Sequence, residues 1–284
     1  MSAIDGPLGF QFSAIVLEGA DVEPFLQGQL SQDVRDLQVD QMAWSFALEP
    51  EGKLGFLLGV MRRSPTEFRL LAGQGDVEAV KQRLLRFKLR VDVTLSDAQM
   101  WHCSFPSGTP VPQEACVISK ASGQNGFIDI VTDELPASTE IVISNDPAQL
   151  NDRWLWNYNV SWDDVEVNLA PSELSDVVAN RCVSFTKGCY TGQELVARMD
   201  ARAATPPSIL MGFKCGFPIQ QGALAVTDGD VAGIVGRSYF NDSLEESHGF
   251  VSVKRKYLAQ AVDSCSVDGQ SVEIMPLESL TPRS

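Results

Sequence analysis

The sequence is poor in the side chains that build metal centres and hydrolytic triads. Only two histidines, His102 and His248, occur among 284 residues, and the six cysteines include no Cys-x-x-Cys pair. The sequence therefore offers few Cys and His ligands from which a clustered zinc or iron site could be built. A Ser-His-Asp hydrolase is poorly supported too, because neither histidine lies in a recognisable setting. We expect no metal ion and no stably bound iron–sulfur cluster.

The chain also lacks basic charge and long apolar runs. Lysine and arginine number 22 against 37 aspartates and glutamates, which gives a formal net charge of −15. Such a surface as a whole repels nucleic acid and anionic membranes, so we expect neither as a direct partner, although a local basic patch can still bind an anion. No apolar run approaches the roughly 20 residues of a membrane span, and the N-terminus does not have the pattern of a signal peptide. The sequence predicts a cytoplasmic protein.

The 284 residues are enough for a large single domain or two to three small ones, and a hydrophobic content of 44% is enough for a packed core. Residue patterns predict helices that begin at Asp21, Asp76 and Asp146, and a short helical turn capped by Ser31. β-Branched and alternating segments predict strands at 10–18, 42–48, 54–61, 68–72, 89–95, 99–105, 115–119, 126–132 and 139–144.

Thr205-Pro206-Pro207 is the clearest linker in the sequence, and composition changes after it. Short strands and Gly-rich turns follow, and Thr227-Asp-Gly-Asp230 is typical of a hairpin turn. Five short strands in about 75 residues are typical of a small barrel or sandwich. The predicted strands are 208–213, 222–227, 231–238, 248–254 and 271–275. We therefore expect an α+β region over 1–205 and a small C-terminal β-barrel over 206–284.

The helix predicted over 77–86 carries Val77, Val80 and Leu84 at helical spacing. Its outer face is expected to be basic. The residues concerned are Lys81, Arg83 and Arg86, followed by Lys88 and Arg90. A solvated face is the ordinary interpretation of such a run. The alternative is a site for an anionic ligand tail.

The densest run of chemically capable residues is Lys187-Gly-Cys-Tyr-Thr-Gly-Gln-Glu194. Thr191 and Glu194 fit a capping box, which predicts that a helix begins at Thr191. The thiolate form of Cys189, two residues earlier, would be favoured by the helix N-terminus and by Lys187. We interpret Cys189 and Lys187 as functional; the alternatives are a packed cysteine and a surface lysine. Because one thiol cannot hold a cluster alone, Cys189 is not expected to bind one stably.

This octapeptide resembles, at every position, the signature of the YgfZ-type folate-binding proteins. These are relatives of the glycine-cleavage T-protein, an aminomethyltransferase, and act in iron–sulfur protein maturation. The likeness covers about residues 11–277. Similar segments are Phe25–Val34, Leu48–Leu54, Phe68–Asp97 and Ala232–Gly236.

The resemblance implies an α+β fold of three subdomains in a ring around a central folate site. Two interleaved subdomains would lie within 1–205, and the third would be the C-terminal barrel. It also implies tetrahydrofolate or a derivative as cofactor. The implied partners are iron–sulfur client proteins or their assembly machinery, including enzymes that modify tRNA.

Several polar and aromatic side chains are candidate folate contacts. Gln27, Gln29 and Asp33 can hydrogen-bond to a pterin edge, which is a row of donors and acceptors; the alternative is an exposed polar helix face. Trp44 and Tyr190 can stack on flat rings or pack as ordinary core aromatics. The remaining candidates are Gly192, Gln193 and Arg198. Arg198, with Arg202 and the basic 81–90 run, would pair with a glutamate tail.

One departure from the T-protein pattern restricts the function. T-protein enzymes carry acidic residues in the hairpin after their Gly-Gly, and one of them serves catalysis. Here Gly52-Lys-Leu-Gly-Phe-Leu-Leu58 contains no carboxylate, so the general acid or base for aminomethyl transfer is missing from this position. We therefore favour a tetrahydrofolate-binding accessory factor for assembly or repair of iron–sulfur proteins. The alternative is a folate-dependent aminomethyl or methyl transferase of the T-protein type.

Overall fold

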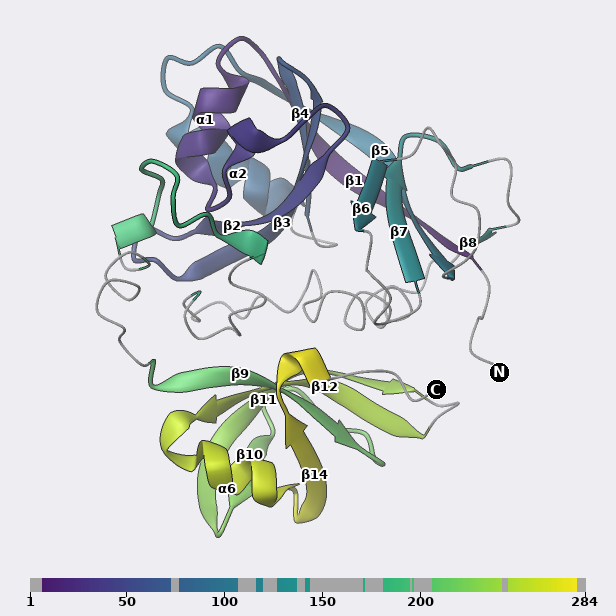
Figure 1. Ribbon diagram of the computed structural model, residues 1–284, viewed down its shortest axis with the longest axis vertical. Coiled ribbons are helices and arrows are strands. Elements are labelled where there is room, and N and C mark those ends of the chain that lie inside the picture. Colours follow the sequence, from purple (N-terminus) through teal and green to yellow (C-terminus); the bar gives the residue numbers. More distant parts are fainter. Residues whose placement is uncertain are drawn as a thin grey trace.

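The computed structural model describes residues 7–72, 77–106, 116–119, 127–136, 141–143, 171, 181–194, 196, 206–241 and 245–279. These residues are mostly sheet with few helices. They form one lobe built on an eight-stranded sheet and a second lobe built on a closed barrel (Figure 1). The helix predicted to begin at Asp146 lies outside the described residues.

The sheet of the first lobe has the strand order β2-β3-β4-β1-β5-β7-β6, with antiparallel neighbours along this path, and β8 pairs with β1 in parallel. Its central strand β1 lies between β4 and β5, and the β2–β3 hairpin forms one edge. The strands are β1 (Leu8–Glu18), β2 (Met42–Leu48), β3 (Leu54–Ser64), β4 (Glu67–Leu71), β5 (Thr94–Pro106), β6 (Cys116–Ser119), β7 (Phe127–Thr132) and β8 (Val142–Ile143).

Two helices, α1 (Val22–Gln29) and α2 (Val77–Phe87), and the short 3₁₀ turn η1 (Val34–Asp36) pack on one face of this sheet. Phe25 and Leu26 of α1 meet Ile15 and Leu17 of β1 in the same buried cluster. The opposite face of β1 is apolar as well and carries Phe10 in a second cluster. Since both faces of the strand are covered, its sequence is a nearly continuous apolar run rather than an alternating one.

The second lobe is a closed barrel with the strand order β10-β11-β12-β9-β14-β13. The predicted C-terminal barrel is thereby confirmed. Its strands are β9 (Ser208–Cys215), β10 (Leu224–Thr227), β11 (Asp230–Asn241), β12 (Glu246–Lys254), β13 (Cys265–Val267) and β14 (Gln270–Met275). Three short helical elements accompany them, namely η3 (Arg255–Tyr257), α6 (Leu258–Asp263) and η4 (Leu277–Ser279).

The predicted hairpin turn at Thr227–Asp230 joins β10 to β11. Asp228 and Gly229 both have positive φ, at 49° and 84°, as a two-residue type I′ turn requires. The same Asp-Gly chemistry joins β13 to β14 at Asp268-Gly269, with φ values of 52° and 77°.

One hydrophobic cluster joins the two lobes. Phe46, Leu48 and Leu57 of the β2–β3 hairpin share it with Leu210 of β9 and Phe250 of β12. Cys182, Val183 and Val196, which flank the octapeptide, lie in the same cluster. The octapeptide is therefore anchored where the edge of the sheet meets the barrel.

Three local predictions were wrong. The strand expected over 89–95 is absent, because Arg90 has φ 56° and β5 begins only at Thr94. The short turn after α1 is capped by Asp33, whose side chain accepts from the Arg35 N–H, rather than by Ser31. Arg83 does not lie on the outer face of α2: it is buried, as are Val80, its neighbour three residues earlier at helical spacing, and Leu84.

Candidate functional site

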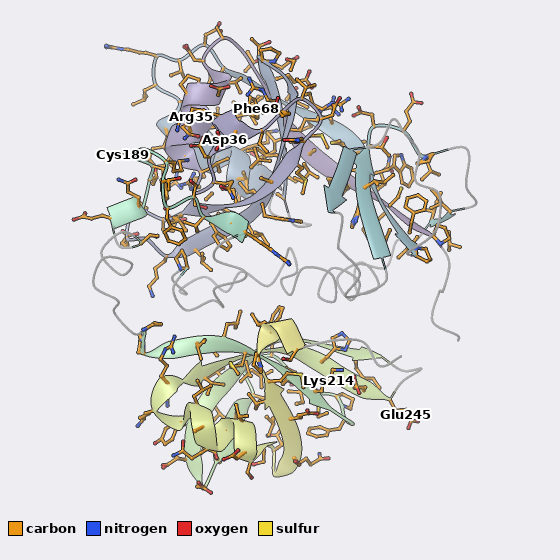
Figure 2. All side chains as sticks on the ribbon, viewed as in Figure 1. Arg35, Asp36, Phe68, Cys189, Lys214 and Glu245 are labelled. Carbon is orange, nitrogen blue, oxygen red and sulfur yellow. The ribbon has the colours of Figure 1, made fainter. Side chains whose placement is uncertain are left out.

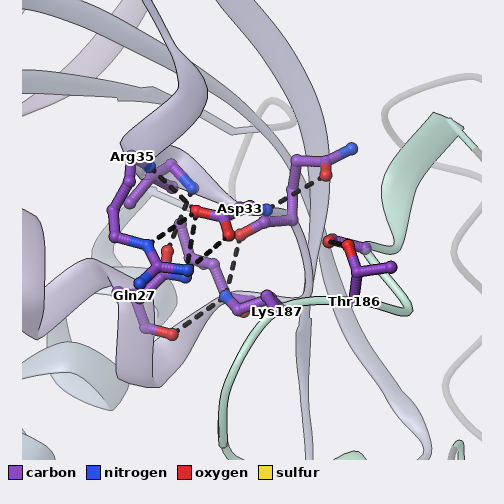
Figure 3. Close-up of polar contacts among 9 residues, drawn as sticks. Gln27, Asp33, Arg35, Thr186 and Lys187 are labelled. Carbon is purple, nitrogen blue, oxygen red and sulfur yellow. Dashed lines mark hydrogen bonds and ion pairs between the residues drawn. The ribbon is translucent and has the colours of Figure 1, made fainter.

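Lys187 opens the octapeptide and lies against the C-terminal end of α1 (Figure 3). Its ammonium donates to the backbone carbonyls of Gln27, Leu30 and Gln32 at 2.9, 2.7 and 2.8 Å. The last carbonyls of a helix have no partner within the helix, so this one cation caps the end of α1. Burial lowers the pKa of Lys187 to about 8, which leaves the amine mostly protonated at neutral pH.

The capping position changes the interpretation of Lys187. Besides the three carbonyls, the ammonium lies 4.9 Å from the centre of the Tyr190 ring. Its positive charge therefore interacts with groups of the protein itself. Neither the surface-lysine nor the thiolate-steering interpretation anticipated this. A role in activating Cys189 stays a prediction. Cys189 itself is an exposed free thiol at the outer edge of the first lobe (Figure 2).

Gln27 and Asp33 form a network beside this cap. Gln27 Nε2 donates to Asp33 Oδ1 at 3.0 Å, and Gln27 Oε1 accepts from the Val34 N–H at 3.0 Å. The Arg35 guanidinium donates to both oxygens of Asp33, at 3.1 and 2.7 Å. Hydrogen bonding to Arg35 lowers the pKa of Asp33 to about 2, so the carboxylate is ionised at neutral pH. Both side chains thus hold the turn between α1 and η1 in place.

The second half of the octapeptide is a tight turn fixed to α1. The Thr191 N–H donates to the Gly28 carbonyl at 3.0 Å, and the Thr191 hydroxyl points to the same oxygen at 3.4 Å. Gln193 Oε1 accepts from the Tyr190 N–H at 3.1 Å. This side-chain-to-backbone bond has the form of a capping box, but it lies one residue earlier than the predicted Thr191–Glu194 pair. Helical residues begin at Gln193 rather than at Thr191.

Gly192 fixes this turn to the β2–β3 hairpin. It has φ 80°, a conformation that residues with a side chain rarely adopt. A Cβ added there would lie 2.8 Å from the Leu48 Cβ and closer still to the Glu49 carbonyl oxygen. The backbone of the octapeptide therefore approaches the hairpin as closely as a glycine allows.

The hairpin is held from its other side by Arg83. This side chain is only 2% exposed, and its Nη2 donates to the Leu48 carbonyl at 2.7 Å. Burial lowers the pKa of the Arg83 guanidinium, against the attraction of Glu49. Sequence reasoning placed Arg83 on the outer face of α2 and did not single out Glu49. Helical spacing from Val80 is the signal that places Arg83 inside. The side chain of Glu49 lies over Gly55, where an added Cβ would be 2.8 Å from its Oε1.

Gln29, Trp44 and Tyr190 are the remaining candidate ligand contacts within the described residues. Gln29 is 9% exposed, and no group among the described residues hydrogen-bonds to its buried Oε1. A buried acceptor of this kind is costly unless something donates to it. Trp44 and Tyr190 are partly buried and pack against the same cluster that joins the lobes. Together they give the site one unmatched acceptor and two flat aromatic surfaces.

The structure brings most of the predicted site residues together. Contacts link Gln27, Asp33, Lys187, Tyr190 and Gln193 through α1 and the octapeptide, and Gly192 joins them to the hairpin. Arg198 and Arg202 lie outside the described residues. Within the described ranges, no group of three or more His, Cys, Asp or Glu side chains is arranged to hold a metal ion. None of the helices described is long and apolar enough to cross a membrane.

No protein-family model matches the chain. It is 26% identical over 202 residues to an uncharacterized protein of Haemophilus influenzae, a match that covers 68% of each chain. It is 26% identical over 209 residues to the tRNA-modifying protein YgfZ of Vibrio vulnificus, covering 66% of this chain and 63% of the relative. For the Vibrio atlanticus protein of that name the identity is 26% over 216 residues, and the shares are 67% and 64%. The chain thus spans just under two thirds of the length of these YgfZ relatives.

Among solved structures, the chain resembles the glycine cleavage system aminomethyltransferase T from Bartonella henselae. The TM-score is 0.74 at 16% sequence identity, and the match covers 97% of this chain and 86% of the other. At this identity the likeness concerns the fold.

Proposed function

Because the chain is a YgfZ-type relative with a fold like that of the glycine-cleavage T-protein, we propose that it is a tetrahydrofolate-binding accessory factor. It would serve the assembly or repair of iron–sulfur proteins, including enzymes that modify tRNA. The relatives' name, tRNA-modifying protein YgfZ, supports the link to tRNA modification, and that link favours a cytoplasmic place of action.

The observation that carries this proposal is the double attachment of the octapeptide. Lys187 fixes its first residue to α1 through three carbonyls, and at Gly192 its turn packs closely against the β2–β3 hairpin. Cys189, between these two anchors, is exposed. A thiol held at a rigid, solvent-facing position suits brief contact with another protein better than storage of a cluster, which needs several ligands.

The three-subdomain ring belongs to this proposal. Two interleaved subdomains would occupy 1–205, and 206–284 would be the third. The T-protein-like fold over 97% of the chain supports this arrangement, as does the cluster that joins the hairpin to the barrel. Folate would lie in the centre of the ring.

The residues present fit a folate. The unmatched, buried Gln29 Oε1 is an acceptor for an N–H of the pterin, and the rings of Trp44 and Tyr190 are surfaces for a flat heterocycle. Gln27, Asp33, Gly192 and Gln193 would shape the site, since contacts within the protein already use their polar groups or backbone. Arg198 would meet the glutamate tail. When bound, tetrahydrofolate supplies the chemistry of a one-carbon carrier.

Calorimetric titration of the purified chain with tetrahydrofolate tests the binding. We expect Gln29→Leu to weaken affinity about tenfold, because one hydrogen bond to a buried acceptor contributes roughly 1–1.5 kcal/mol. Gln38→Leu is the matched control, since Gln38 is exposed. Absence of tetrahydrofolate binding by the wild type, or equal affinity of Gln29→Leu and wild type, would contradict the folate proposal.

The transferase alternative retains one supporting observation. Residues 52–58 of the hairpin carry no carboxylate, but Glu49 lies over Gly55 next to the closely packed Gly192 turn. In that alternative, Glu49 would be the general acid or base for aminomethyl transfer. Turnover of an aminomethyl donor with tetrahydrofolate, lost in Glu49→Gln, would promote the transferase. Without turnover, the accessory factor remains the proposed function.

A further inference from the structure

A short exposed segment at the end of α2 alternates apolar and basic residues. This basic–apolar segment is Leu85-Arg-Phe-Lys-Leu-Arg90. Its apolar side chains are open to solvent: Leu85 is 44%, Phe87 37% and Leu89 76% exposed. Single exposed apolar residues are ordinary; here three lie within five residues and are separated by cations.

The cations of this segment differ from several other cations of the same lobe. No ion pair or side-chain hydrogen bond engages Arg86, Lys88 or Arg90 in the part of the chain that the structure describes. Five other cations of the lobe are paired with nearby carboxylates. The pairs are Arg35 with Asp33, Arg62 with Glu23, Arg63 with Asp40, Arg69 with Glu67, and Lys81 with Asp97. In a chain of net charge −15, these three neighbouring cations are therefore available to bind an anion from outside the chain.

The segment has a fixed place in the fold. The Arg83 guanidinium lies 5.4 Å from the centre of the Phe87 ring and donates to the Leu48 carbonyl. The chain then turns sharply, with hydrogen bonds from the Lys88 N–H to Leu85 and from the Leu89 N–H to Phe87. Ordered backbone and a stacked ring reduce the entropy that binding must overcome.

We propose that the basic–apolar segment docks an acidic, apolar stretch of a partner protein. Three unpaired cations match carboxylates of that stretch, and the exposed Leu and Phe side chains match its apolar residues. One such peptide therefore complements both the basic and the apolar side chains of the segment. A bare anion would complement only the basic ones, and an apolar ligand only the apolar ones.

Net charge favours a short peptide over the larger polyanions. Removing the three positive charges of the segment from the net charge of −15 leaves −18 on the rest of the chain. A nucleic acid or an anionic membrane extends far beyond the segment and meets that negative surface. A short acidic peptide covers the segment and meets less of the negative surface around it. The proposal does not depend on folate binding.

Fluorescence anisotropy tests the docking with a labelled nine-residue peptide that alternates glutamate and leucine. We expect Arg86→Glu/Arg90→Glu to weaken binding at least tenfold. Lys254→Glu/Lys256→Glu changes the net charge equally, at exposed positions on the barrel, and is the control that should bind like wild type. Leu89→Ser should weaken binding about fivefold, because it removes an exposed apolar contact without touching the core. Unchanged thermal unfolding of each variant checks folding.

Several results would overturn the proposal. The peptide could fail to bind, or bind the two double variants equally. If a polyglutamate peptide of the same length bound as tightly as the alternating one, the apolar residues would contribute nothing. The segment would then be a site for an anionic tail. A single-stranded oligonucleotide, or vesicles containing phosphatidylserine, binding more tightly and losing that affinity in Arg86→Glu/Arg90→Glu would assign the surface to those partners.

Discussion

Gly192→Ala is the substitution that tests the contact between the octapeptide and the hairpin most sharply. Gly192 has φ 80°, and a side chain in that left-handed conformation costs roughly 1–2 kcal/mol. The added Cβ would also lie 2.8 Å from the Leu48 Cβ and nearer still to the Glu49 carbonyl oxygen, so the turn or the hairpin must move. Such overpacking costs about 1–3 kcal/mol. We expect a total loss of about 2–5 kcal/mol.

Two other glycines separate the backbone cost from the steric one. Gly222 has φ 87° with nothing within 4 Å of an added Cβ, so Gly222→Ala should lose only the conformational part. Gly188 has neither positive φ nor a close neighbour, so Gly188→Ala should be nearly neutral. Urea unfolding of the three variants gives the free energies of unfolding directly. If Gly192→Ala and Gly222→Ala agreed within about 0.5 kcal/mol, the tight contact with the hairpin would be refuted.

Two predictions concern the charges around α1. Lys187→Met should lower the free energy of unfolding by about 2–4 kcal/mol, because three carbonyls lose their donor; urea unfolding should show this, and Lys256→Met on the exposed barrel surface should not. The folded pKa of Asp33, about 2, lies below its ordinary value of 3.8, so its stabilisation is present above pH 3.8 and lost as pH falls through 2. Asp33→Asn should therefore cost about 1 kcal/mol at pH 7, allowing for solvent screening, and much less at pH 2, where about half of the carboxylate is protonated. A difference as large at pH 2 as at pH 7 would contradict the Asp33–Arg35 pairing.

The sequence predicted those parts of the fold that depend on local chemistry. Asp228-Gly229 specifies a type I′ turn by itself, and the flanking strands of the barrel follow from it. β13 was missed because Cys265–Val267 is too short to show a period. In the stretch predicted as a strand over 89–95, Leu89 is exposed, but Val93 is buried in the core and Val91 packs against it, although β5 begins only at Thr94. Alternation therefore identified the buried side of this segment but not its backbone conformation.

The site was predictable as a list of residues but not as an arrangement. The octapeptide stands out in the sequence by its composition. The partners of its lysine and its Gly192, however, lie far away in the sequence. Lys187 caps carbonyls 155 to 160 residues away in sequence, and Gly192 is required by a hairpin 140 residues earlier. Local periodicity carries no information about such pairings. Arg83 could have been placed inside by its helical spacing from Val80, but its charge favoured a solvent-facing interpretation.

The central claim is that this chain serves iron–sulfur proteins through the exposed thiol of Cys189. The most direct measurement is the activity of iron–sulfur enzymes in a strain that lacks the protein, after complementation with wild type, Cys189→Ser or Cys215→Ser. Cys215 is the control, since it is a free thiol on β9 of the barrel whose pKa burial raises. We predict that wild type and Cys215→Ser restore activity and that Cys189→Ser, although folded and expressed, does not. Full restoration by Cys189→Ser would contradict the claim.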